Sequence, residues 1–146
     1  MKQTIDLIKK FGNPFLNRNQ VEAAMIVWVI PQDIAENIPA LPEKIFCNAL
    51  MVNPLEIAFR ALIRLGLHTE IKTYDGCFNI RLSRSGTVIS KHAWGLAIDL
   101  NAADNPLNGK VTWSKPFLEV WREGKWTLGA DWTKPKDGMH FQWDNF

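Results

Sequence analysis

Residues 90–100 read SKHAWGLAIDL, and this stretch decides both the expected fold and the expected site. Within residues 95–100, apolar side chains alternate with small or acidic ones, which is typical of a strand with one face in the core. Asp99 lies on the other face, next to Gly95 and Ala97, whose small size leaves open space around the carboxylate. The stretch therefore predicts a half-buried strand that presents an acidic group.

A second stretch near the end of the chain repeats this pattern. Residues 139–143, MHFQW, also alternate, and His140 lies on their polar face. His92 is seven residues before Asp99, on the turn expected to enter the first strand. Two imidazoles and one carboxylate suit a catalytic Zn²⁺ with an open fourth position. Spacing alone leaves a second interpretation open, in which the histidines are structural.

Two further charged residues extend this candidate site. Asp137 is three residues before His140, where a carboxylate could take a proton from an activated water without binding the ion. Arg81 precedes His92 by eleven residues. Its guanidinium could hold a substrate carboxylate or a developing oxyanion through paired hydrogen bonds.

These segments resemble a known family, the zinc D-alanyl-D-alanine metallopeptidases. Residues 90–99 match its SxHxxGxAxD motif, and residues 137–141, DGMHF, resemble its second motif, an acidic residue followed three positions later by histidine. Residues 76–81, GCFNIR, look like the segment that carries the family arginine. Residues 126–132, WTLGADW, are similar to a WGGxW stretch of phage members, with alanine in place of its second glycine. The resemblance extends over residues 22–143.

The resemblance implies a role for each motif residue. By motif position, His92, Asp99 and His140 would be the zinc ligands. Asp137 would be the general base, where many carboxypeptidase members carry glutamate and the endopeptidase branch has aspartate. Arg81 would stabilise the oxyanion or bind a substrate carboxylate.

The resemblance also implies a substrate, the stem peptide of peptidoglycan. The expected protein is a zinc-dependent hydrolase of the phage lysin (endolysin) type, and either an L-Ala–D-Glu endopeptidase or a D-Ala–D-Ala carboxypeptidase. Ser90 would bind near the metal or substrate, unless it is a turn-forming serine. The alternative is an inactive peptidase-like module that binds cell-wall fragments or is a structural component of a phage.

The remaining sequence predicts an α+β fold with a small antiparallel sheet and flanking helices, in one domain over residues 1–146. The resemblance implies a fold like that of the hedgehog and D-Ala-D-Ala peptidases. Strands and helices alternate irregularly, which argues against a βαβ repeat. The expected elements are a helix from Thr4 to near Gly12, a buried strand over 22–30, an irregular loop over 31–44, a helix over 54–65 with Asn53 as N-cap and Pro54 first, a strand over 69–74 before an Asp75-Gly76 turn, and a helix over 116–123 capped by Ser114.

Composition excludes several other classes of protein. The chain has 146 residues, 47% of them hydrophobic and 22% charged, which is ordinary for a globular domain. A net charge of +2 is too small to indicate nucleic-acid binding. Six of the seven tryptophans follow residue 90, and we expect them in the core rather than on a stacking platform; Cys47 and Cys77 are expected as buried thiols.

The sequence also suggests where the protein acts. The N-terminus lacks the apolar segment of a signal peptide, and no apolar run reaches the roughly 18 residues that span a bilayer. We expect a monomer without membrane or nucleic-acid partners. It would be made in the host cytoplasm and reach the cell wall or periplasm by holin release or with the phage particle.

Overall fold

Two antiparallel sheets and five α-helices make up the computed structural model, which describes residues 2–146. Strands β1 and β2 form one sheet, and the other has the order β3-β4-β6-β5. The predicted α+β class is therefore confirmed. In chain order the elements are α1 (Lys2–Phe11), α2 (Arg18–Ala23), β1 (Met25–Val29), α3 (Gln32–Asn37), β2 (Lys44–Asn48), α4 (Ala49–Arg64), η1 (His68–Glu70), β3 (Tyr74–Gly76), η2 (Lys91–Trp94), β4 (Ala97–Leu100), α5 (Lys115–Glu123), β5 (Thr127–Leu128), η3 (Gly129–Asp131) and β6 (His140–Gln142).

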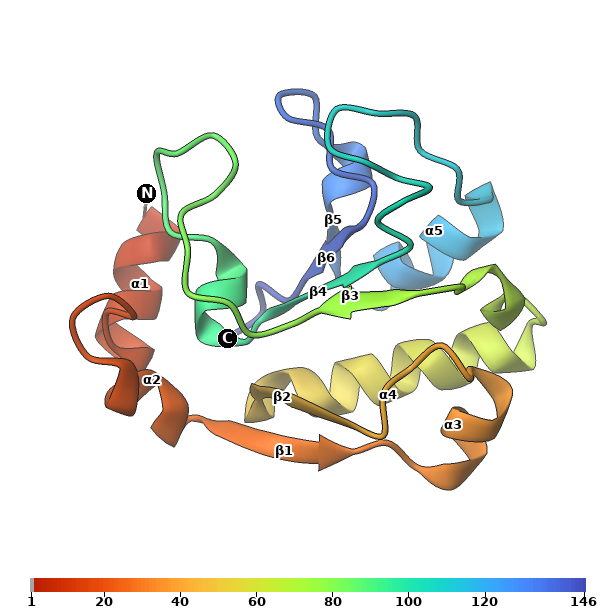
Figure 1. Cartoon of the computed structure of the whole chain (residues 1–146), viewed down its shortest axis with the longest axis horizontal. Helices are drawn as coiled ribbons and strands as arrows, with labels where there is room; N and C mark the ends of the chain where they lie inside the picture. The colour runs from red at the N-terminus through yellow and green to blue at the C-terminus, as the bar shows by residue number, and fades with distance from the viewer. Residues whose placement is uncertain (1) are drawn as a thin grey trace.

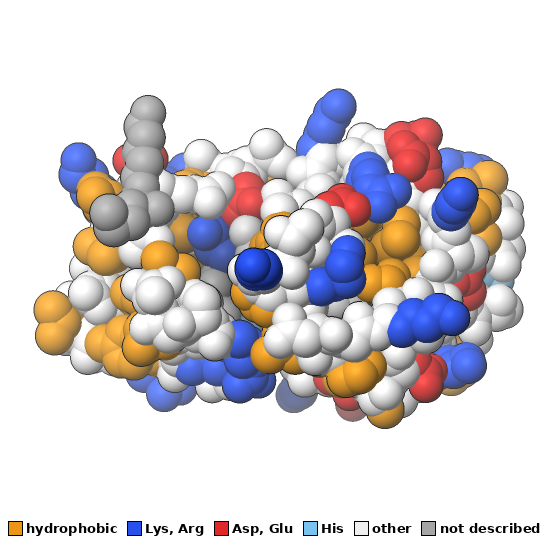
Figure 2. Space-filling model, turned by 90° about the horizontal axis from the view of Figure 1, so that it is seen from above, with side chains coloured by type: hydrophobic (Ala, Val, Ile, Leu, Met, Phe, Trp, Pro, Cys, Tyr) orange, Lys and Arg blue, Asp and Glu red, His pale blue; other side chains and the backbone are white. Residues whose placement is uncertain are grey.

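The four-stranded sheet separates a helical layer from a layer of loops (Figure 1). Helix α4 runs below the sheet, and the loops over 82–89 and 132–137 rise on the opposite side. Figure 2 views the molecule from that opposite side, where lysine and arginine side chains are spread among acidic and hydrophobic ones. The space between the sheet and these loops is where the candidate site lies.

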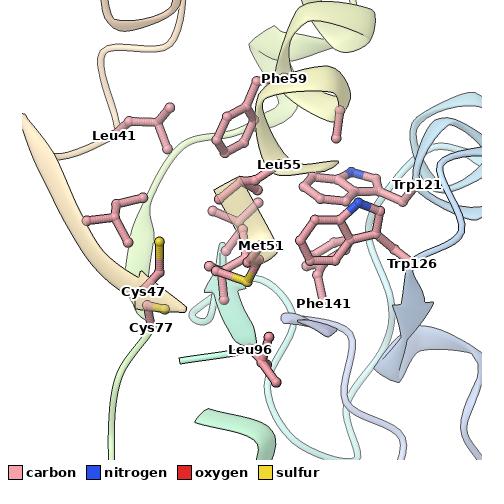
Figure 3. Packing of buried hydrophobic residues seen from close by; sticks show 14 of the residues in the cluster. Leu41, Cys47, Met51, Leu55, Phe59, Cys77, Leu96, Trp121, Trp126 and Phe141 are labelled. Carbon is pink, nitrogen blue, oxygen red and sulfur yellow. The ribbon is translucent and has the colours of Figure 1, made fainter. Parts of the chain in front are cut away.

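The main core fills the space between α4, α5 and the sheet (Figure 3). Phe141 of β6 and Phe59 of α4 are fully buried, and both contact Trp121 of α5, with ring centroids 4.5 Å and 6.1 Å away. Trp94, Trp113, Trp121 and Trp126 are all buried, which confirms the core interpretation for these four tryptophans. Burial of several large aromatic side chains supplies much of the driving force that fixes this sheet against its helices.

Helix α4 begins earlier than predicted. Its N-cap is Asn48, whose side-chain oxygen accepts a hydrogen bond from the Leu50 N–H, and Pro54 lies inside the helix. The expected cap at Asn53 and start at Pro54 were therefore wrong. Asn48 is buried, and its backbone N–H donates to the Gly95 carbonyl at 3.0 Å. This contact between distant residues fixes the start of α4, and a local sequence pattern does not reveal it.

The apolar run over 22–30 is a strand only from Met25, because α2 extends to Ala23. Burial along β1 is not continuous: Met25 and Trp28 are buried, while the other three residues are exposed, and the strand pairs only with β2. The segment 31–44 is not an irregular loop: it contains α3 and the first residue of β2. Pro31 occupies the N-cap of α3, a position where proline's missing N–H is tolerated.

The prediction of a strand over residues 69–74 is also wrong. Residues 68–70 form the 3₁₀ turn η1, and β3 begins only at Tyr74 and includes the Asp75-Gly76 pair expected as a turn. The Asn101 side-chain oxygen accepts the N–H groups of Lys72 and Thr73, at 2.8 and 3.0 Å. An amide side chain therefore provides the hydrogen bonds that a neighbouring strand would have provided.

The other expectations hold with small shifts. Helix α1 ends before Gly12 as predicted but begins ahead of Thr4, and α5 is capped by Ser114, whose Oγ accepts from the Phe117 N–H. Both cysteines, Cys47 and Cys77, are buried free thiols. Among the described helices, none combines the length and apolar character needed to cross a membrane.

Candidate active site

Strands β4 and β6 bring two of the predicted metal ligands together. They pair in antiparallel register, with Asp99 directly opposite His140. Their neighbours Ile98 and Phe141 point the other way and are fully buried in the core. The alternation read from both stretches is confirmed, since each strand presents one polar ligand on the face away from α4.

The short helix η2 carries the third predicted ligand, His92. Ser90 caps this helix, and its Oγ accepts the His92 N–H at 3.3 Å. Gly95 ends it in the left-handed region, with φ at +66°. A Cβ at this position would collide with the Met25 side chain and the backbone of Asn48, so only glycine fits there. The serine and glycine of the motif thus both position His92.

The side chains of His92, Asp99 and His140 converge. One ligand atom from each lies within 4.8 Å of the others. His92 Nε2 is 3.1 Å from one Asp99 carboxylate oxygen, and His140 Nδ1 is 3.3 Å from the other. Burial disfavours the charged carboxylate, but the two imidazoles outweigh it and hold the pKa of Asp99 well below its usual range. Asp99 is therefore an anion in this setting.

The three groups fit a zinc ion by their donor chemistry. His92 Nε2 and Asp99 Oδ1 are buried and have no hydrogen-bond partner among residues 2–146. His92 Nδ1 lies 2.6 Å from the Cys77 carbonyl oxygen, which can only accept, so Nδ1 carries the hydrogen and the neutral imidazole keeps its lone pair on Nε2. Buried, unpartnered lone pairs are costly unless a cation uses them. Two imidazoles and a carboxylate are a typical catalytic zinc set with one position left open.

Asp137 lies beside this cluster and has the properties of a proton acceptor. It is buried, and its Oδ1 has no hydrogen-bond partner among the described residues. Burial, with a smaller contribution from the Asp99 charge, raises the pKa of Asp137 above its ordinary value. Its backbone is fixed on both sides, because its N–H donates to the Gly129 carbonyl at 2.9 Å and its own carbonyl accepts the His140 N–H at 3.1 Å.

A cavity of about 270 Å³ opens above these residues, between the loop over 82–89 and the segment 132–137. Its walls include Ser90, Trp132, Asp137 and His140. The indole of Trp132 lies 5.2 Å from the His140 ring, measured between centroids. Trp132 thus differs from the core tryptophans, because it forms part of the wall beside a predicted ligand.

Arg81 borders both this cavity and a neighbouring one of about 330 Å³ that contains His92 and Asp99. Within the described part of the chain, Arg81 forms no salt bridge, and its Nη1 donates only to the Leu82 carbonyl. Burial and the nearby Arg84 lower the pKa of Arg81. A half-buried guanidinium without a carboxylate partner is suited to bind an anionic group of a ligand.

The structure places further residues at the candidate site that the sequence motifs did not predict. Gln142 contacts His140, and Gly129 supports Asp137. Gln142 lies on the same strand face as His140, so the alternation of residues 139–143 already contained that signal. Cys77 contributes a backbone carbonyl rather than its thiol, whose pKa burial raises well above the ordinary value.

Comparison with known proteins agrees with this geometry. Residues 83–143 match the family model described as D-alanyl-D-alanine carboxypeptidase. The matched segment holds all three predicted ligands and Asp137, and begins just after Arg81. Neither the comparison with curated proteins nor that with solved structures gave a match. The resemblance is confirmed over 83–143, a shorter range than 22–143, and over this segment the chain is similar to the family described as D-alanyl-D-alanine carboxypeptidase.

Proposed function

We propose that this protein is a zinc metallopeptidase that hydrolyses a peptide bond in the stem peptides of peptidoglycan. The observation that carries the proposal is the convergence of His92, Asp99 and His140 beside the buried, unpartnered carboxylate of Asp137. The family match supports the same chemistry at the level of a metallopeptidase. Three ligands, one open position and an adjacent proton acceptor are what hydrolysis by a metal-activated water requires.

In the proposed reaction, Asp137 moves the proton. Zinc held by His92, Asp99 and His140 would polarise the scissile carbonyl and lower the pKa of a water so that it can attack near neutral pH. Asp137 accepts the proton released by that water and then gives it to the amine that leaves as the C–N bond breaks. Its raised pKa makes Asp137 a stronger base than an ordinary aspartate, so it accepts the proton from the water more readily.

Arg81 and Ser90 are proposed to hold the substrate. The unpaired Arg81 guanidinium, which borders both cavities, would bind the developing oxyanion or a carboxylate next to the cut bond. Ser90 Oγ accepts a hydrogen bond from the His92 N–H, which leaves its own O–H free to donate. Ser90 lines the cavity of about 270 Å³, the space that a substrate would fill.

Two bonds in the stem peptide fit this site, L-Ala–D-Glu and D-Ala–D-Ala. In both cases the residue on the amine side of the bond carries a free carboxylate for Arg81. Aspartate at position 137 favours the endopeptidase branch, and with it a phage-type lysin that acts as a monomer. Such an enzyme would reach the wall after holin release or with the phage particle.

Release of amines from purified peptidoglycan tests the proposal. We expect the zinc-loaded protein to release amines, a chelator to stop it and added zinc to restore it. Asp137→Asn should reduce turnover by about 10²- to 10⁴-fold, the usual contribution of a general base, and should keep its zinc. Asp104→Asn is the matched control, since Asp104 is exposed and contacts Lys72 away from the site. Wild-type turnover in Asp137→Asn would remove Asp137 as the base, and no turnover in the wild type would favour an inactive binding module.

A further inference from the structure

A row of polar side chains continues outward from His140. His140 Nε2 lies 2.8 Å from Gln142 Oε1, and Gln142 Nε2 donates to both oxygens of Asp144, at 3.0 and 2.9 Å. Lys91 Nζ lies 3.9 Å from the Asp144 carboxylate and donates to the Gln3 side chain at 3.2 Å. These contacts link the strand that bears His140 to the residue that directly precedes His92.

The donors and acceptors in this row allow one arrangement. The Asp144 carboxylate only accepts hydrogen bonds, so the NH₂ group of the Gln142 amide must face it. The Gln142 carbonyl oxygen then faces His140 and can only accept, so it takes the Nε2 hydrogen. A histidine that carries its hydrogen on Nε2 keeps the lone pair on Nδ1. That is the nitrogen which points to the cluster, 3.3 Å from Asp99.

The residues in this row are largely buried, which strengthens their hydrogen bonds. Gln142 and His140 are 7% and 5% exposed, and the Lys91 and Asp144 side chains are 10% and 17% exposed. Water therefore competes weakly for the hydrogen bonds, and the charge of Asp144 is compensated by Lys91. Lys91 is in turn held by Gln3 of α1. The row is anchored at its outer end as well as at His140.

We propose that Gln142 and Asp144 are positioning residues that orient His140 for the metal: Asp144 fixes the Gln142 amide, and that amide fixes the His140 hydrogen on Nε2. The inference rests on the proposed zinc site. It explains why the two histidines present different nitrogens, since His92 is oriented by a backbone carbonyl and His140 by a side chain. Partners of this kind raise the basicity of a ligand and hold its ring in place.

Gln142 also lines the cavity of about 270 Å³ beside Trp132, so a direct contact with substrate is the competing role. The two roles predict different measurements. A substrate contact would change KM and leave zinc affinity as it is. A positioning residue changes zinc affinity, and it does so without any substrate present.

Zinc affinity, measured by competition with a chromophoric chelator, is the first test. Gln142→Met keeps the size of the side chain and removes the acceptor, and we expect about 10- to 100-fold weaker zinc binding. In Gln142→Glu combined with Asp144→Asn, carboxylate and amide exchange places, so position 142 still accepts from His140 and position 144 now donates. This double variant should bind zinc within a few-fold of the wild type. Gln32→Met, at an exposed glutamine on α3 that contacts Glu36, should have no effect.

Hydrogen exchange in the zinc-loaded protein is the second test. The Nε2 hydrogen of His140 should give a slowly exchanging NMR signal in the wild type, and Gln142→Met should lose it. The Nδ1 hydrogen of His92, bound by the Cys77 carbonyl, is an internal control that should stay protected in both proteins. Loss of both signals would instead indicate general disruption and would contradict a specific role.

The outcomes separate this inference from the proposed function. If the wild type binds zinc and Gln142→Met binds it equally well, the positioning role is wrong, whatever the activity. If Gln142→Met weakens zinc binding but the wild type cuts no peptidoglycan, the positioning role holds and the proposed substrate is wrong. A wild type that binds no zinc would overturn both.

Discussion

Gly129 lies directly against the backbone of Asp137. The Gly129 carbonyl accepts the Asp137 N–H at 2.9 Å. A Cβ added to Gly129 would overlap the Asp137 carbonyl oxygen and come within 3.0 Å of the His140 Cβ. The proposed base and one proposed ligand are therefore positioned by a close backbone approach that only glycine permits.

Replacing this glycine should damage the site and the fold together. Gly129→Ala forces the Asp137 backbone to move, and overpacking of this kind costs about 1–3 kcal/mol of unfolding free energy. We expect lower thermal stability and a large loss of peptidase activity, measured by calorimetry and amine release. Gly124→Ala is the control, because its Cβ would meet only ordinary contacts at 3.4 Å. Equal behaviour of the two variants would contradict the role of Gly129.

The acidic limb of the pH–activity profile should have an apparent pKa above that of an ordinary aspartate. Asp137 must be deprotonated to accept a proton, and burial raises its pKa. Activity should therefore fall, as pH decreases, at a higher pH than an unperturbed carboxyl with a pKa of about 3.9 would give. The profile of kcat/KM against pH measures this limb, and a limb at or below the ordinary value would contradict the assignment.

The same pKa shift has a consequence for stability. In the folded protein Asp137 binds its proton more tightly than in the unfolded chain, so stability falls as pH rises from the unfolded pKa to the folded one. Above the folded pKa the cost of the buried charge is fully present. Asp137→Asn should therefore raise the melting temperature of the metal-free protein at pH 7, and a lower melting temperature would contradict this account.

Zinc should stabilise the fold through Asp99. A ligand that binds only the folded state adds about 2.7 kcal/mol at a free concentration 100-fold above its Kd. We expect zinc to raise the melting temperature of the wild type, and Asp99→Ala to lose that rise because one of three ligands is gone. Asp104→Ala, at an exposed carboxylate, should keep it. A full zinc-induced rise in Asp99→Ala would show that the ion binds elsewhere.

Arg81 should contribute mainly to the reaction rate. Removing one preorganised donor to an oxyanion commonly lowers kcat by about 10²- to 10³-fold, and we expect Arg81→Ala to lose activity on that scale. Arg122→Ala, at an exposed arginine that pairs with Asp131, is the control. An effect on KM alone would assign Arg81 to binding of a substrate carboxylate, and no effect would exclude it from the site.

The features predicted best from the sequence are those encoded locally. The alternation of residues 95–100 and 139–143 identified β4 and β6, and the cap at Ser114 identified α5. The structure shows that the two strands pair, and their register places Asp99 opposite His140. The ligand cluster follows from two short patterns and the turn that carries His92.

The features that were missed depend on contacts between distant residues. Asn48 rather than Asn53 caps α4, because Asn48 is held by Gly95 far along the chain. The Asn101 side chain occupies the N–H groups of residues 72 and 73, which an apolar pattern alone would assign to a strand. The alternating pattern placed Gln142 on the polar face of its strand beside His140. Its role depends on Asp144 and Lys91, which only the folded chain brings together.

The most direct test of the central claim is the mass of the products. Zinc-loaded wild type and Asp137→Asn should be incubated with purified peptidoglycan and with a free stem pentapeptide, and the digests analysed by mass spectrometry. The account predicts products that the variant does not form, and stem peptides lacking their L-alanine would identify the L-Ala–D-Glu bond. Loss of one terminal D-alanine would identify the D-Ala–D-Ala bond instead. The absence of any cleavage that depends on Asp137 would contradict the claim that this protein is a peptidoglycan peptidase.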